Sequence, residues 1–330
     1  MKPYRVGLVG MGQIAAGYDN PSDRAVRTHL KAVLQEPRLC LAAVADIDEI
    51  KARAELARFG STADILSPEQ ILQADLDVLC IATPDGTHLD LVELAAAGSA
   101  KLVLCEKPLE CDGQRRRQAC RAMEKNGGTL VMNHSRQWLP DIGNAFARAS
   151  GGDYGAPISA VVHYCRGFRH NGIHALDLLA GFLGGQVLSA SRIADDIFDY
   201  SAQDATRSLL VTLDFGGHAV PVLIRGIDGR IQNTFEFDIR FERARVRVFD
   251  DKWTRMEIYG KAVSEYFGFA DELTLTHQFV DEPASLMQRA WCNVADYLQG
   301  EAPMASSGSN ALLAYDLADA ILDQAGRSQR

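Results

Sequence analysis

A carboxylate and an ammonium stand side by side in this chain, at Glu106 and Lys107, directly after the apolar run 101–105. The run is too short and too rich in valine and leucine for a helix, so it predicts a buried parallel strand, which Pro108 ends. Open α/β sheets bind their ligands beyond the carboxyl ends of such strands. The pair is therefore predicted to face a ligand at a sheet edge, and a surface ion pair is the alternative.

A glycine motif of the kind that binds nucleotides occurs near the start of the chain, immediately after the apolar segment 5–9. Its pattern is G-x-G-x-x-A, made by Gly10, Met11, Gly12, Gln13, Ile14 and Ala15. The first glycine permits a tight turn, the second lets the backbone approach a pyrophosphate, and Ala15 lets a helix pack on the strand. The amino end of that helix would offer N–H groups and a positive dipole to phosphate. For an isolated match, a plain glycine turn is the alternative.

An acidic residue, Asp46, ends the second apolar segment, 41–45. A carboxylate there can accept hydrogen bonds from both hydroxyls of an adenosine ribose and would repel a 2′-phosphate, which favours NAD over NADP. Asp46 lies farther from the glycines than the usual spacing of about 20 residues, and we attribute the excess to a turn-like loop at 17–23. The alternative role for Asp46 is to cap the helix after it.

The composition is that of a globular protein in a reducing compartment. The 330 residues suggest two domains, and a net charge of −9 argues against a general nucleic-acid or anionic-membrane surface. The seven cysteines include no C-x-x-C pair and are interpreted as buried apolar residues. No segment has the length of a membrane span, and the strand predicted near the amino end leaves no room for a signal peptide, so we expect a cytoplasmic location.

The first 130 residues alternate between strand and helix patterns, which predicts a doubly wound parallel sheet with helices on both faces. Strands are predicted near 4–10, 39–45, 77–82, 101–106 and 129–132, and helices include 85–97 and 112–126. The arginines at 115–117 are expected on the wet face of the second of these helices.

After about residue 150, polar and apolar residues alternate over 208–215, 234–242 and 243–248. Such strands belong to an antiparallel sheet with one wet face. Two late helices, 285–298 and 310–325, could cover its apolar face. We place the domain boundary at 130, within the interval 120–150, with a second α+β domain over 131–330.

The chain resembles the glucose-fructose oxidoreductase / inositol dehydrogenase family (Gfo/Idh/MocA) over essentially its whole length. The resemblance is carried by Gly10-Met11-Gly12, Asp46, Thr83-Pro84-Asp85-Gly86-Thr87-His88, Glu106-Lys107-Pro108 and Asn171-Gly172-Ile173-His174-Ala175-Leu176-Asp177. It implies a Rossmann domain followed by a domain with a large, mostly antiparallel sheet. It also implies bound NAD or NADP, hydride exchange at a sugar or polyol carbon, and an open sheet face that packs on another subunit in a homodimer or homotetramer.

The resemblance also implies residue roles. Lys107 matches the family's active-site lysine, whose ammonium would hydrogen-bond the substrate oxygen and stabilise a forming alkoxide, while Glu106 helps to position Lys107 and the cofactor. Thr83 and Pro84 would lie against the cofactor. His88 would begin the next helix and is a candidate cofactor-binding residue, with a helix cap or an interdomain contact as the alternative.

His174 matches the general acid–base histidine of many members, and an imidazole suits proton exchange near neutrality. A buried structural histidine is the alternative. Asp177 lies one turn later and could orient His174, or could cap or pair locally.

One position departs from the family pattern. Many family dehydrogenases carry an aspartate four residues before the histidine, where this chain has His170. If the helix includes both, His170 and His174 share a face, and His170 could take a catalytic role or bind a substrate hydroxyl or phosphate. Histidines at this spacing also occur in metal sites, but no third ligand has suitable spacing, so no metal is predicted.

The segment Asn133-His134-Ser135-Arg136-Gln137-Trp138 and the form Asn171-Gly172 are similar to a branch of the family associated with surface-polysaccharide and nucleotide-sugar metabolism. Arg136 could bind a carboxylate or phosphate of a substrate, with an interdomain salt bridge as the alternative. Asn171 and Asp177 are further candidate substrate ligands.

Taken together, the pattern favours an NAD-dependent oxidoreductase acting on a hydroxyl-bearing carbon of a sugar, cyclitol or nucleotide-sugar. One alternative is an NAD-dependent glycosidase, which oxidises a sugar transiently and reduces it again. The other is a nucleotide-responsive regulator, against which the presence of both Lys107 and His174 argues. The expected partner is a small carbohydrate, with no nucleic acid and no membrane.

Overall fold

The computed structural model describes residues 2–109, 113–261, 273–281 and 283–327. The chain divides into two compact units, of which the first comprises 1–138 and 282–312 and the second 139–281 and 313–330. This corrects the expected division at 130, because the late segment 282–312 returns to the first unit. There, helix α8 (Leu286–Gln299) packs on α1 (His29–Gln35) and buries Trp291 completely.

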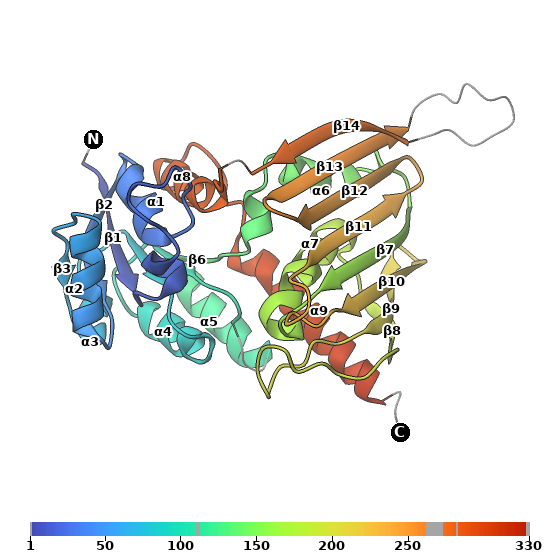
Figure 1. Cartoon of the computed structure of the whole chain (residues 1–330), viewed down its shortest axis with the longest axis horizontal. Coiled ribbons are helices and arrows are strands. Elements are labelled where there is room, and N and C mark those ends of the chain that lie inside the picture. The colour runs from blue at the N-terminus through green and yellow to red at the C-terminus, as the bar shows by residue number, and fades with distance from the viewer. Residues whose placement is uncertain (1, 110–112, 262–272, 282, 328–330) are drawn as a thin grey trace, which may run out of the picture. The chain divides into compact units, whose positions relative to one another are not determined.

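The first unit is built on a six-stranded parallel sheet in the order β3-β2-β1-β4-β5-β6 (Figure 1). Its strands are β1 (Tyr4–Val9), β2 (Leu39–Ala45), β3 (Asp64–Ile65), β4 (Val78–Ile81), β5 (Leu102–Cys105) and β6 (Thr129–Met132). All residues of β4 and β5 are buried, as in a sheet covered on both faces. The predicted strands are confirmed, and β3 is an addition of two residues, too short for a sequence pattern to show.

Short helices connect these strands. They are η1 (Gln13–Gly17), α1, α2 (Glu49–Arg58), α3 (Pro68–Leu72), η2 (Asp85–Thr87), α4 (His88–Ala95), α5 (Gly113–Lys125) and η3 (Ser135–Trp138). The helix expected over 85–97 is thus η2 followed by α4, and α5 corresponds to the one expected over 112–126, whose residue 112 lies outside the described part. Arg116 is fully buried, so the expectation that 115–117 form a wet face is wrong for this residue.

The glycine motif leads directly into the helical segment η1, as expected, and this segment is short and ends at Gly17. A loop over 18–28 follows before α1 begins, with Thr28 as its N-cap. The carboxylate of Asp19 accepts hydrogen bonds from the backbone of Arg27 and Thr28, and the ammonium of Lys31 donates to three carbonyls of the loop. These hydrogen bonds make the loop an ordered part of the first unit. Its length accounts for the long spacing between the glycines and Asp46.

The second unit contains an eight-stranded sheet in the order β14-β13-β12-β11-β7-β10-β9-β8, in which β7 and β10 are parallel and the other pairs antiparallel. Its strands are β7 (Pro157–Tyr164), β8 (Val187–Arg192), β9 (Leu209–Phe215), β10 (His218–Gly226), β11 (Phe235–Phe241), β12 (Ala244–Asp250), β13 (Thr254–Lys261) and β14 (Leu273–Val280). The predicted mostly antiparallel sheet is confirmed, including the turn at Gly216 and Gly217 between β9 and β10.

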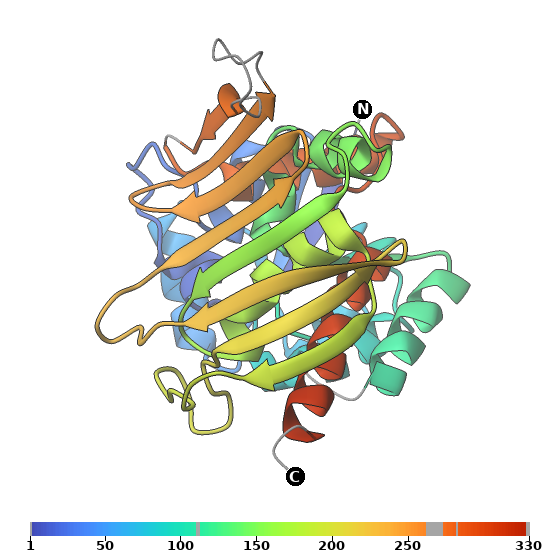
Figure 2. The same cartoon turned by 90° about the vertical axis from the view of Figure 1, so that its right-hand side faces the viewer.

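Helices cover one face of this sheet, as Figure 2 shows. They are α6 (Ile142–Ser150), η4 (Phe168–Gly172), α7 (Ile173–Leu183) and α9 (Gly308–Arg327). Ten of the eleven residues of α7 are buried, and its Phe182 lies 5.9 Å from the ring of Phe237 on β11. Because α8 belongs to the first unit, the cover comes from α6, α7 and α9, and not from both predicted late helices.

Candidate functional site

A cavity of about 690 Å³ opens at the carboxyl ends of β1, β2 and β4 in the first unit. Its volume falls within the range of about 300–1,000 Å³ that is usual for ligand sites. The lining brings together seven predicted cofactor-binding residues: Gly10, Gly12, Gln13, Ile14, Asp46, Thr83 and Pro84. Residues far apart in sequence thus converge at the ligand-binding edge of a parallel sheet.

The two glycines of the motif have different reasons to be glycine. Gly10 has φ +87°, and a Cβ atom there would lie 2.6 Å from the carbonyl oxygen of Ala82, so no side chain is tolerated. A Cβ atom on Gly12 would meet nothing within 4 Å. Gly12 lines the cavity, so its lack of a side chain leaves room for a ligand to approach the backbone.

Asp46 is held by the backbone at the end of β2. Its Oδ2 accepts a hydrogen bond from the N–H of Met11 at 2.7 Å, and its Oδ1 accepts from the N–H of Asp48 at 2.9 Å. Each carboxylate oxygen can accept a further bond, so ribose hydroxyls fit. The N-cap of α2 is Asp48, which rules out the alternative role of Asp46 as the cap.

Two further residues line the cavity. Tyr18, at the start of the long loop, is 59% exposed, and Lys51 places its ammonium 3.9 Å from Oδ2 of Asp46. Neither was singled out from the sequence. The sequence position of Lys51 could have indicated it, because Lys51 lies on the first turn of α2, three residues after the N-cap Asp48.

His88 begins α4, as predicted, and is buried. Its Nε2 lies 2.8 Å from the carbonyl oxygen of Thr83, and its Nδ1 lies 2.8 Å from that of Pro108. The ring therefore joins the turn after β4 to the turn after β5. It does not line the cavity, so its contacts support a structural role in place of direct cofactor binding.

Glu106 and Lys107 follow β5 directly, with Glu106 buried and Lys107 half-buried. One oxygen of Glu106, Oε1, lies 2.8 Å from Nε2 of His29 and 2.5 Å from Nδ2 of Asn133. Burial raises the pKa of Glu106, but the hydrogen bonds from His29 and Asn133 outweigh it and hold the pKa below the usual value. The surface-pair alternative does not describe Glu106, which is an ordered, ionised group inside the unit.

The other candidates of the histidine motif lie in the second unit. His174 is buried on α7, one turn before the buried Asp177. Asn171 donates its side-chain amide to the carbonyl of Cys165 at 2.9 Å, which ties it to the chain after β7. Asn171 therefore has a structural contact in addition to any role toward a substrate.

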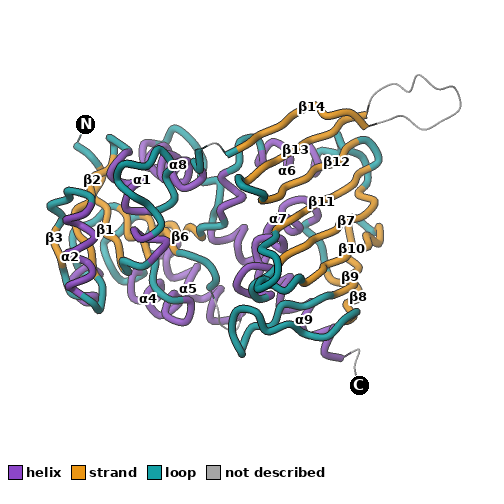
Figure 3. The backbone as a smooth tube through the Cα atoms, in the orientation of Figure 1, coloured by secondary structure: helices purple, strands orange, loops and turns teal. Residues whose placement is uncertain are grey.

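His170 lies in η4, where its ring stacks on Tyr200 with centroids 3.9 Å apart. Tyr200 is part of the long loop between β8 and β9, teal in Figure 3. The carboxylate of Asp204, in the same loop, accepts hydrogen bonds from the backbone N–H groups of Arg169 and His170. Tyr200 is a residue that the sequence did not reveal, because nothing local pairs it with His170.

Arg136 is buried in η3 of the first unit, and its Nη1 donates to Oγ of Ser135 at 3.2 Å.

Among the residues that the structure describes, no three His, Cys, Asp or Glu side chains converge as a metal ion would need. No described helix is long and apolar enough to cross a membrane.

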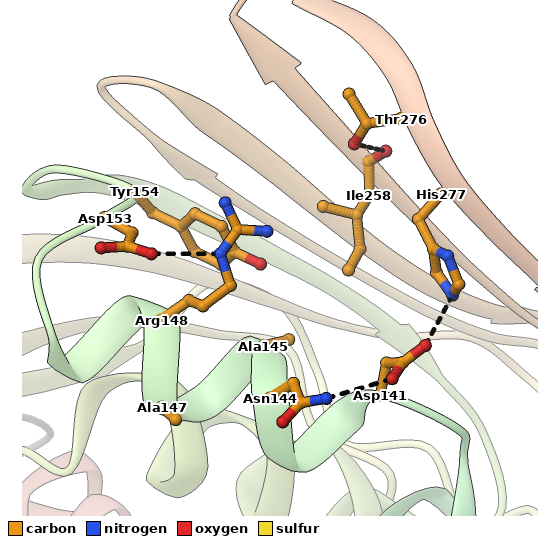
Figure 4. Close-up of a pocket in the computed structure, with 10 residues that line it drawn as sticks. All are labelled: Asp141, Asn144, Ala145, Ala147, Arg148, Asp153, Tyr154, Ile258, Thr276 and His277. Atoms are coloured by element: carbon orange, nitrogen blue, oxygen red, sulfur yellow. Dashed lines mark hydrogen bonds and ion pairs between the residues drawn. The ribbon is translucent and has the colours of Figure 1, made fainter.

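A second cavity, of about 550 Å³, lies in the second unit between α6 and the strands β13 and β14 (Figure 4). Polar side chains that line it lie close to each other: Asp141 to His277 at 3.2 Å, and Arg148 to Asp153 at 3.2 Å. None of the predicted site residues lines it.

Residues 4–134 match the family described as "Oxidoreductase family, NAD-binding Rossmann fold" (GFO_IDH_MocA). Over this segment the chain is similar to the Gfo/Idh/MocA family. It is 28% identical to inositol 2-dehydrogenase of Rhizobium meliloti (strain 1021) over 216 residues, which are 61% of each chain. The match thus spans about three fifths of that relative's length.

Solved structures with the same fold cover nearly the whole chain. A putative myo-inositol dehydrogenase from Sinorhizobium meliloti 1021 superposes with a TM-score of 0.68 at 22% identity, covering 98% of both chains. The transcriptional regulator Gal80p from Kluyveromyces lactis superposes with a TM-score of 0.76 at 14% identity, covering 99% of this chain and 90% of its own. At these identities the likeness concerns the fold alone, and the fold occurs in a dehydrogenase and in a regulator.

Proposed function

We propose that this protein is an NAD-dependent oxidoreductase that transfers a hydride to or from a hydroxyl-bearing carbon of a sugar, cyclitol or nucleotide-sugar. The proposal rests on one observation: the cavity and the Glu106-Lys107 pair lie at the ends of two paired strands, β4 and β5. The cofactor-sized cavity includes the turn after β4, and Glu106-Lys107 follows β5, which pairs with β4. The similarity to inositol 2-dehydrogenase of Rhizobium meliloti supports the substrate class.

The cavity residues fit a dinucleotide. The open space over Gly12 would admit a pyrophosphate, the carboxylate of Asp46 would accept the adenosine ribose hydroxyls, and Thr83 and Pro84 would bound the path toward Lys107. Bound NAD supplies the hydride acceptor or donor. The carboxylate of Asp46 supports NAD over NADP, because a 2′-phosphate would meet its negative charge.

Lys107 would donate a hydrogen bond to the substrate oxygen and stabilise the negative charge that grows there during oxidation. The hydroxyl proton must leave in the same reaction, and His174 would accept it as the general base. In the reverse direction the same groups would return the proton. His170, packed on Tyr200, would contact the substrate beside His174.

The test measures reduced nicotinamide formed from NAD or NADP with a panel of inositols, aldoses and UDP-sugars, alongside release of aglycone from matching glycosides. The proposal expects net reduction of NAD with at least one polyol and a lower rate with NADP. Aglycone release without net NADH would instead indicate the glycosidase. NAD binding that is unchanged by every polyol and glycoside would favour the regulator.

A further inference from the structure

A buried chain of hydrogen bonds connects Glu106 to Trp291, which lies more than 180 residues later in the sequence. The indole Nε1 of Trp291, on α8, donates to Nδ1 of His29 at 3.1 Å, and Nε2 of His29 lies 2.8 Å from Oε1 of Glu106. All three residues belong to the first unit, and both Trp291 and His29 are completely buried.

The chemistry of the indole fixes the tautomer of His29. An indole N–H can only donate, so Nδ1 of His29 must be the acceptor and carries no hydrogen. The ring hydrogen therefore lies on Nε2 and is donated to the Glu106 carboxylate. Trp291 thus determines that His29 presents a donor, and not a lone pair, to Glu106.

A second branch reaches the same oxygen from the other side. Nδ2 of Asn133 donates to Oε1 of Glu106 at 2.5 Å, and Nε1 of Trp138 donates to Oδ1 of Asn133 at 2.8 Å. In each branch a tryptophan N–H orients the residue that donates to the carboxylate: Trp291 orients His29, and Trp138 orients Asn133. Both donors bind Oε1, whereas Oε2 makes no hydrogen bond with any residue in the described part of the chain.

We propose that His29 and Trp291 are positioning residues of the site: they anchor Oε1 of Glu106, so that Oε2 stays available as an acceptor and Lys107 is held in one arrangement. Glu106 keeps 9% of its side chain exposed, and Oε2 is the oxygen that would accept from a hydroxyl donor of the cofactor or substrate. None of His29, Trp291 and Glu106 lines the cavity of the first unit. His29 binds Glu106 directly and Trp291 binds His29, so both act through Glu106. The inference rests on the proposed function, because it is the hydride transfer that the anchored carboxylate would serve.

The kinetic test compares His29→Gln, His29→Leu and Trp291→Phe with the wild type. Gln keeps an N–H that can reach Glu106, Leu removes it, and Phe keeps an aromatic ring but removes the indole donor. We expect His29→Leu to lower kcat by about tenfold or more through misplacement of the reacting groups, with KM for NAD little changed. His29→Gln should recover most of the rate, and Trp291→Phe should fall between the two.

The control is Leu30→Ala, which removes a fully buried side chain next to His29. It should lower the melting temperature and leave kcat unchanged. Equal rates for His29→Gln and His29→Leu, or a kcat that follows only the melting temperature, would overturn the inference. A wild type without turnover would count against the proposed function itself, before any variant is compared.

A second readout does not depend on turnover. With 15N-labelled histidine, NMR distinguishes the two ring tautomers, and the His29 signals are assigned by their loss in His29→Gln. We expect the hydrogen on Nε2 in the wild type and a change in the Nδ1 shift in Trp291→Phe. A hydrogen on Nδ1 in the wild type would contradict the hydrogen-bond chain.

Discussion

At the scale of single residues, Asp46 is the predicted determinant of cofactor choice. We expect Asp46→Ser to weaken NAD binding by about tenfold or more, since a hydrogen bond to a charged group contributes about 1.5–3 kcal/mol. Binding of NADP should improve relative to NAD, because the repelling charge is gone. Titration calorimetry with both dinucleotides measures this. Asp64→Ser, at an exposed position of β3, is the matched control, and an unchanged NAD to NADP ratio in Asp46→Ser would contradict the assignment.

The buried carboxylate of Glu106 predicts a pH dependence of stability. Its pKa in the folded protein lies below the usual 4.5, since the hydrogen bonds from His29 and Asn133 outweigh burial. A lowered pKa contributes stability that is present above the unfolded pKa and is lost as the pH falls through the folded pKa. The measurement is therefore the free energy of unfolding with urea. As the pH falls from about 5 to about 3, it should fall more steeply for the wild type than for Glu106→Gln. Parallel pH profiles for the two proteins would show that this carboxylate is not specially stabilised.

The residues predicted from the sequence were those with local signals. The glycine motif, Asp46 and the turn at Thr83-Pro84 each follow an apolar strand, and the strand ends bring them into one cavity. His29 and Trp291 had no such signal, because they are 262 positions apart and meet only when α8 packs on α1. Nothing in the local sequence around either residue marks that contact.

At the scale of elements, the loop over 18–28 depends on one buried ammonium. Nζ of Lys31 donates to the carbonyls of Asn20, Asp23 and Ala25 at 2.7–2.9 Å, and Lys31 is 2% exposed. Lys31→Met leaves these carbonyls without their donor. We expect a loss of about 3 kcal/mol in the free energy of unfolding and weaker NAD binding, since Tyr18 of this loop lines the cavity.

The comparison for Lys31→Met is Lys101→Met. Lys101 is 66% exposed and pairs with Asp77 on the surface, so its removal should cost less than about 1 kcal/mol. Chemical denaturation measures both variants. Equal losses would indicate that the buried ammonium does not organise the loop.

Strand patterns proved more informative than helix patterns. Segments such as 39–45 and 129–132 coincide with β2 and β6, since a short, continuous apolar run has few alternatives in a parallel sheet. The glycine motif predicted a helix after β1 but not its length, and the segment η1 ends as early as Gly17. The prediction that α8 covers the antiparallel sheet was wrong for a different reason. Its amphipathic pattern shows that it packs on a core, but not on the core of which unit.

At the scale of the whole molecule, the open face of the second sheet leads us to propose a homo-oligomer. Leu210, which is 47% exposed, pairs in register with Leu223, and Leu223 pairs with Val161. These three side chains form an apolar centre on the face away from the helices. Light scattering should give more than one subunit for the wild type and a lower mass for Leu210→Asp. Leu94→Asp, on α4 of the first unit, is the control, and a monomeric wild type would remove the proposal.

The role of Lys107 is tested by measuring kcat/KM of Lys107→Met for the best polyol substrate, with Lys101→Met as the control. If Lys107 stabilises the charge on the reacting oxygen, kcat/KM should fall by about 100-fold or more, while the dissociation constant for NAD changes little. Lys101→Met should retain the wild-type rate. A Lys107→Met protein that oxidises the substrate as fast as the wild type would contradict the account.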